Sequence, residues 1–151
     1  MTTRHQTATV TLPSDTEILI TRRFEAPREL VWDALTTPRH LLRWWGPSWC
    51  PLVACEVDLR PGGAWRYVCR DEEGNEYAFH GVFHGDPSPD GMVQTFEYEG
   101  FPGHVSLDTL TLEERDGKTV ARTNTVFQTI EARDGMMESG MEIGVDEGYD
   151  R

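Results

Sequence analysis

The sequence has little basic charge and lacks long apolar runs. No segment approaches the roughly 20 consecutive apolar residues needed to cross a bilayer, and the polar residues 1–16 contain no apolar core of a signal peptide. We therefore expect residues 1–15 to form a loose tail and the protein to be cytoplasmic. Fourteen Lys and Arg face 26 Asp and Glu, giving a net charge of −12. Nucleic acids and anionic membranes need basic surface, so we expect neither as a partner.

Groups typical of metal and cofactor sites are also scarce. Cys50, Cys55 and Cys69 lack the C-x-x-C spacing of zinc sites, which favours free thiols in a reducing compartment. His80 and His84 share one face of a predicted strand without an Asp, Glu or Cys at suitable spacing, so we place them on the solvent face. No glycine-rich loop opens a helix, and no G-x-S-x-G motif occurs. The sequence therefore predicts no metal, no cofactor and no catalytic residue.

Aromatic residues, in contrast, are plentiful, with five Trp, four Tyr and six Phe among 151 residues. The hydrophobic fraction of 38% and the charged fraction of 26% are ordinary for a globular protein. This length is enough for one hydrophobic core. We predict one domain over residues 16–151.

Residue patterns predict helices at both ends of a series of strands. A β-branched segment at 16–24 predicts a strand, Pro27 begins a helix, and Thr37 and Pro38 begin a second helix that ends at Gly46. Six further strands follow, separated by tight turns that require antiparallel pairing. They are expected at residues 52–59, 64–70, 76–84, 92–99, 105–114 and 118–127.

The C-terminal segment, from about residue 134 to 151, returns to helical spacing. Its stripe contains Met137, Gly140, Met141, Gly144, Val145, Gly148 and Tyr149. Each glycine costs about 1 kcal/mol in a helix interior, so packing must hold this helix in place. Glycine on the buried side allows close backbone approach or leaves space beside the helix. The chain stops without a Gly or Pro signal, so we expect the helix to continue beyond residue 151.

Five motifs in order resemble a known family. They are F-E-A-P-R-E-L-V-W-D-A-L at 24–35, W-W-G-P at 44–47, D-L-R-P-G-G at 58–63, D-E-E-G-N-E at 71–76 and the segment 135–148. Together they are similar to the bacterial START-like (SRPBCC) group related to the C-terminal domain of the heat-shock-protein-90 ATPase activator. The resemblance implies an α+β helix-grip fold, with a curved antiparallel sheet of about six to seven strands around a C-terminal helix. It also implies a cavity between them.

Strand alternation places many aromatic side chains on one side of this sheet. These side chains either fill the core or line a pocket, and the glycines of the helix and the family resemblance favour a pocket. The predicted lining is Trp44, Trp45, Trp65, Tyr67, Phe79, Phe83, Phe96, Tyr98, Met137 and Met141.

Three functions remain open at this point. The first is a carrier or sensor for a small apolar or aromatic molecule. The second is a co-chaperone. In the eukaryotic activator, however, much of the stimulation is attributed to a separate N-terminal domain, so we expect no chaperone partner. The third is a cyclase- or hydrolase-like enzyme on aromatic or polyketide substrates, which requires a buried polar group in the pocket. A homodimer through a strand edge or residues 44–49 is compatible with the sequence.

Overall fold

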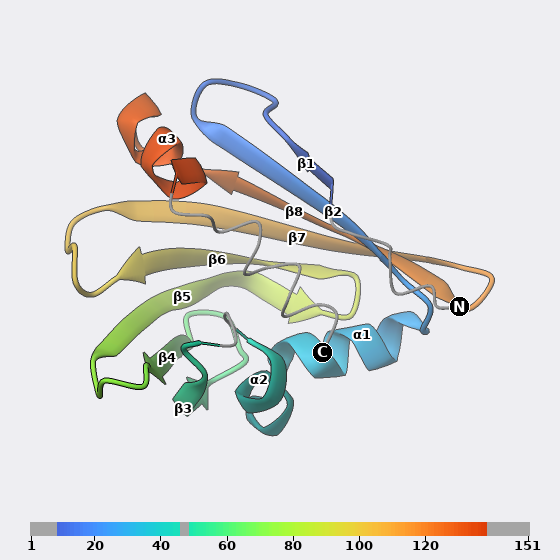
Figure 1. Ribbon diagram of the computed structural model, residues 1–151. Helices are drawn as coiled ribbons and strands as arrows, with labels where there is room; N and C mark the ends of the chain where they lie inside the picture. Colours follow the sequence, from blue (N-terminus) through green and yellow to red (C-terminus); the bar gives the residue numbers. More distant parts are fainter. Residues whose placement is uncertain (1–8, 46–48, 139–151) are drawn as a thin grey trace.

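The computed structural model describes residues 9–45 and 49–138, which form an α+β helix-grip fold (Figure 1). One antiparallel sheet has the strand order β1-β2-β8-β7-β6-β5-β4-β3. The elements are β1 (Thr9–Thr11), β2 (Glu17–Phe24), α1 (Arg28–Thr36), α2 (Pro38–Trp44), β3 (Leu52–Val57), β4 (Ala64–Arg70), β5 (Glu76–Ser88), β6 (Gly91–Tyr98), β7 (Val105–Arg115), β8 (Lys118–Val126) and α3 (Ile130–Glu138). None of these helices has the length and apolar character that a membrane crossing needs.

The sheet has eight strands rather than the six to seven expected. The additional strand is β1, which lies within the segment predicted to be a loose tail and pairs Val10 with Ile20 at the sheet edge. Its Thr-Val-Thr sequence is β-branched throughout and suits a strand. The largest differences in the other bounds are that β5 continues to Ser88 instead of residue 84 and that α3 begins at Ile130 instead of about residue 134.

Turn chemistry sets the strand connections as the sequence predicted. Gly62 has φ +76°, and the Gly63 amide donates to the Arg60 carbonyl at 2.9 Å, as in a type II turn between β3 and β4. Asp116 and Gly117 both have positive φ, 57° and 77°, which suits the type I′ turn of the β7–β8 hairpin. These turns fix which residues of neighbouring strands face each other.

The three helices all contact one face of the sheet, called here the inner face. Val31 of α1 packs with Leu110 and Leu112, and Leu41 of α2 is buried with Trp65. The α3 methionines contact a third cluster, built on β2. Figure 1 shows α1 and α2 together at one side of the sheet and α3 near its β1–β2–β8 end. The grip predicted from the sequence is therefore present, although residues 139–151 lie outside the described residues.

Candidate functional site

An aromatic network on the inner face connects α2 with β4, β5 and β6. Trp65 lies 4.6 Å from Tyr67 and 5.7 Å from Phe96 between ring centroids. Phe79 lies 5.5 Å from Phe96, and Trp45 contacts both Tyr67 and Phe79 at 5.1 and 5.3 Å. Tyr98 joins through Phe79 at 5.3 Å. Tilted and edge contacts at these distances are the favourable geometries of aromatic pairs.

Burial divides the network into a core and an open part. Trp65, Tyr67 and Phe83 are 1%, 7% and 2% exposed and act as core side chains. Every residue of β6 is half-buried, Phe96 and Tyr98 included. The residues left half-buried are Trp44, Trp45, Phe79, Phe96 and Tyr98. This half-buried group is the part of the predicted lining that an incoming molecule would meet.

The structure does not bring Met137 to the aromatic network. Met137 packs with Met136 and Ala132 against Ile18 and Ile20, at the other end of the inner face. Met141 lies outside the described residues, as do the glycines of the predicted stripe.

The Trp44 indole donates a hydrogen bond to the Ala34 carbonyl at 2.8 Å and so connects α2 to α1.

A row of polar side chains crosses the inner face beside the aromatic network. Asp108 on β7 lies between Gln94 on β6 and Thr125 on β8, its direct partners in register. Thr125 forms a side-chain hydrogen bond with the carboxylate, and Gln94 Nε2 lies 3.5 Å from Asp108 Oδ2. Asp108 is half-buried.

Apolar surroundings shift the titration of this carboxyl. The inner-face positions along β7 on either side of Asp108 are Ser106 and Leu110, and Ile18 follows Thr125 across the sheet. None of these carries a charge. Burial raises the pKa of Asp108 to about 6, against the lowering effect of the hydrogen bonds from Thr125 and Gln94.

Sequence reasoning missed Asp108, although a signal for it exists. Leu110 and Leu112 are buried, and strand alternation places Asp108 on the same face of β7. An acidic residue two positions before a buried leucine in the same phase therefore marks a carboxylate on the inner face, whereas Glu114, also in phase, lies at the exposed end of β7. The aromatic residues form a pattern over several strands, whereas Asp108 is an isolated polar position.

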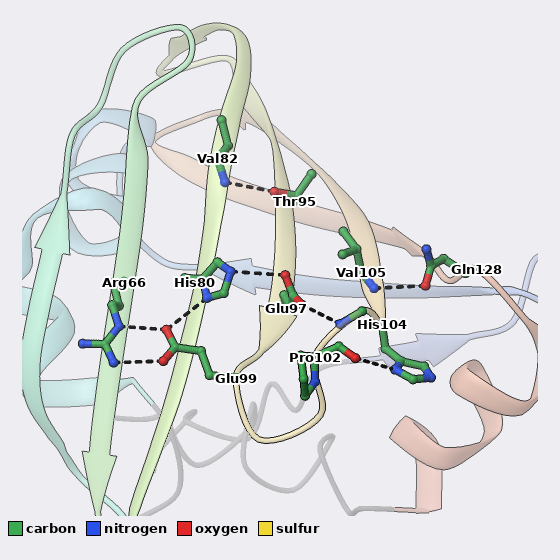
Figure 2. Close-up of polar contacts among 11 residues, drawn as sticks. Arg66, His80, Val82, Thr95, Glu97, Glu99, Pro102, His104, Val105 and Gln128 are labelled. Atoms are coloured by element: carbon green, nitrogen blue, oxygen red, sulfur yellow. Dashed lines mark hydrogen bonds and ion pairs between the residues drawn. The ribbon is translucent and has the colours of Figure 1, made fainter.

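A second polar cluster lies on the outer face of the sheet (Figure 2). Arg66 donates through Nε and Nη2 to the two carboxylate oxygens of Glu99, at 2.8 and 2.9 Å. His80 lies between two carboxylates, with Nδ1 3.0 Å from Glu99 and Nε2 3.2 Å from Glu97. Glu97 also accepts the Gly103 amide at 2.7 Å, which ties the loop after β6 to the sheet. Hydrogen bonds from Arg66 lower the pKa of Glu99 to about 2.

His80 lies on the outer face, as predicted, but it has acidic partners that sequence spacing did not reveal. His80 pairs directly with Glu97 across β5 and β6, and antiparallel pairing brings together residues that sequence spacing keeps apart. Both Glu97 and Glu99 are engaged in hydrogen bonds and ion pairs that connect neighbouring strands and a loop, so we assign the cluster a structural role. Within the described ranges, no group of three His, Cys, Asp or Glu side chains is placed to hold a metal ion.

Among the surface depressions formed by residues 9–45 and 49–138 are two whose linings include none of the half-buried rings of the aromatic network. One of about 340 Å³ is lined on the outer side by Arg66, His80 and Val82. The other, about 320 Å³, lies at the β5–β6 hairpin and includes Asp90 and Met92. The candidate site therefore rests on the partial exposure of inner-face side chains, with Phe79, Phe96 and Asp108 in its centre.

Comparison with known proteins identifies relatives along almost the whole chain. The sequence profile of the family described as "Activator of Hsp90 ATPase homolog 1-like protein" matches residues 25–151. No functionally curated protein has a matching sequence.

Solved structures of bacterial proteins share this fold. One from Rhodobacter sphaeroides is 28% identical with a TM-score of 0.88, covering 94% of this chain and 93% of that chain. One from Mycobacterium smegmatis is 28% identical with a TM-score of 0.81, covering 93% and 91%. A solution structure from Arthrobacter aurescens is 26% identical with a TM-score of 0.83, covering 94% and 87%. The descriptions of these three structures name no activity.

Proposed function

The chain belongs to the activator of Hsp90 ATPase homolog 1-like family, and on that premise we propose that it is a cytoplasmic carrier or sensor for a small aromatic or hydrophobic molecule. The site is the inner face of the sheet around Phe79, Phe96 and Tyr98. One observation carries the proposal: these three side chains belong to a continuous aromatic network but stay half-buried. Three free cysteines are in keeping with a reducing compartment.

Burying the remaining exposed area of these rings would stabilise a complex. Removal of apolar surface from water contributes about 25 cal/mol per Å², and aromatic pairs add to this through edge and offset contacts. The buried Trp65 and Phe83 belong to the core cluster against which Phe79 and Phe96 pack, and this packing keeps the half-buried rings in place. A rigid aromatic surface loses little conformational entropy when a ligand binds.

The position of the rings on the inner face favours a small molecule over a protein partner. The half-buried rings lie on the helix-covered face of the sheet, where a flat protein surface would have limited access. The family description names an activator of a chaperone, and we do not extend that activity to this chain.

Catalysis on an aromatic substrate is the second candidate, and Asp108 is the observation in its favour. A carboxyl with a pKa of about 6 is suited to proton transfer near neutral pH. In the part of the chain that the structure describes, however, no histidine is hydrogen-bonded to a serine, threonine or cysteine that could act as a nucleophile. Binding is therefore the function proposed.

Titration of the isotopically labelled protein with 2-methylnaphthalene, followed by ¹H–¹⁵N NMR, tests the proposal. We expect saturable shifts of the amides around Phe79, Phe96 and Tyr98. Phe79→Leu and Phe96→Leu reduce ring area without adding charge, and each should weaken binding several-fold. Val82→Ala on the outer face is the matched control and should leave binding unchanged. Absence of saturable shifts, or shifts confined to the outer face, would overturn the proposal.

A further inference from the structure

The inner face combines aromatic rings with the Asp108 carboxylate, which has acceptor capacity to spare. An ionised carboxylate offers about four lone-pair positions. Thr125 and Gln94 are the hydrogen-bond partners of Asp108, and the Gln94 contact is long at 3.5 Å. Both lie beside Asp108 in the plane of the sheet, so the side of the carboxylate facing away from the sheet is where further donors would bind.

Asp108 also lies where three apolar clusters meet. Leu110, the next inner-face residue on β7, belongs to the cluster under α1, and Ile18 belongs to the cluster under α3. On β6, Gln94 precedes Phe96 of the aromatic network by two residues. Two residues along a strand span about 7 Å and neighbouring strands lie about 5 Å apart, so Phe96 and Asp108 are separated by about 8 Å.

We infer that the ligand is a bicyclic or similarly sized aromatic molecule that carries a hydrogen-bond donor, a hydroxyl or an amine, which Asp108 accepts while the rings contact Phe96. This inference rests on the proposed function and specifies its ligand class. The separation of about 8 Å matches a two-ring molecule with the donor at one end. An anionic substituent at that position is excluded by repulsion from the carboxylate.

The polar row gives this selectivity a physical basis. A ligand without a donor leaves the ionised carboxylate desolvated in apolar surroundings, which is costly. Burial raises the pKa of Asp108 to about 6, in keeping with a cost for the uncompensated charge. A donor from the ligand removes that penalty.

Three probes of equal ring size test the inference: 2-naphthol, 2-methylnaphthalene and 2-naphthoate, titrated at pH 7.5 by NMR into the full chain. We expect 2-naphthol to bind about tenfold more tightly than 2-methylnaphthalene, and 2-naphthoate to bind most weakly. In Asp108→Leu the preference for 2-naphthol should disappear while 2-methylnaphthalene still binds. Asp108→Asn keeps a neutral acceptor and should give an intermediate preference. Asp86→Asn, at the exposed end of β5, is the matched control and should behave as the natural chain.

The outcomes separate this inference from the proposed function. Equal binding of all three probes, tighter binding of 2-naphthoate, or an unchanged preference in Asp108→Leu would overturn the role of Asp108 and leave the binding function in place. Failure of all three probes to bind would overturn the proposed function itself.

Discussion

Trp65 and Gly81 lie directly opposite each other on β4 and β5, and the buried indole occupies the space that a side chain at Gly81 would need. A Cβ atom at Gly81 would lie 2.6 Å from Trp65 Nε1 and would overlap the Thr95 backbone carbonyl. Real Cβ atoms do not approach so closely, so the backbone or the indole would have to move. The glycine thus leaves room beside β5 for Trp65, the largest fully buried side chain of the described residues.

Gly81→Ala should therefore destabilise the protein by about 2 to 3 kcal/mol, because overpacking against backbone cannot be relieved by a side-chain rotation. Urea unfolding followed by tryptophan fluorescence measures the change. Gly135→Ala in α3 is the matched control, since nothing lies within 4 Å of the position of its Cβ. That variant should gain up to about 1 kcal/mol from helix propensity. Equal stability of Gly81→Ala and the natural chain would contradict the packing described.

The ion pair on the outer face should make stability depend on acid pH. Hydrogen bonds from Arg66 lower the pKa of Glu99 from 4.5 to about 2, so the carboxylate stabilises the fold fully above about pH 4.5. This contribution is lost as pH falls toward 2, because the folded state then has to take up a proton that it binds weakly.

Glu99→Gln should remove this part of the pH dependence. The expected difference in the free energy of unfolding between pH 6 and pH 2.5 is about 1 kcal/mol or less, since water reaches the pair. Urea midpoints at the two pH values provide the measurement. Glu72→Gln, in an exposed turn, controls for the loss of a negative charge. Identical pH dependence in the natural chain and Glu99→Gln would contradict the expectation.

Much of the fold could be predicted because its signals are local. Alternation along β4 correctly placed Trp65 and Tyr67 inside and Arg66 outside, since side chains of a strand alternate with a strict period of two. The hairpin between β7 and β8 has a local signal too, because an Asp-Gly pair such as Asp116 and Gly117 favours the positive φ angles of a type I′ turn.

The features that could not be predicted depend on pairing between segments that are distant in the sequence. The contact of His80 with Glu97 needs the β5–β6 register, and β1 becomes a strand only because the edge of β2 is available to pair with Val10. Asp108 lies on the inner face by the same alternation that placed Trp65. Its importance follows from Gln94 and Thr125, which come from two other strands.

The three cysteines should react slowly with thiol reagents. Burial raises the pKa of Cys55 to about 11 and that of Cys69 to about 12, and it also raises the pKa of Cys50. Only the thiolate is nucleophilic, so labelling by 5,5′-dithiobis(2-nitrobenzoate) at pH 7.5 should be about a hundredfold or more slower than for a free cysteine. All three thiols should react rapidly in urea. One fast-reacting thiol in the native protein would show that its environment differs from the one described.

Asp108 should lower stability at neutral pH, and this effect can be measured without any ligand. Burial raises the pKa of its carboxyl from 3.8 to about 6. Below about pH 4 both the folded and unfolded states are protonated. As pH rises from about 4 to 6 the unfolded state loses its proton first, so the free energy of unfolding falls, and above pH 6 the penalty is constant.

Asp108→Asn removes this penalty and keeps an oxygen that can accept from Thr125. The variant should be more stable than the natural chain by about 1 to 3 kcal/mol at pH 7 and nearly equal to it at pH 4. Urea unfolding at both pH values, with Asp86→Asn as the control, measures the difference. A variant less stable at pH 7 would mean that the carboxylate is better solvated than its apolar neighbours indicate. A gain in stability together with a weaker preference for 2-naphthol would show that Asp108 serves binding at the expense of the fold, as functional sites commonly do.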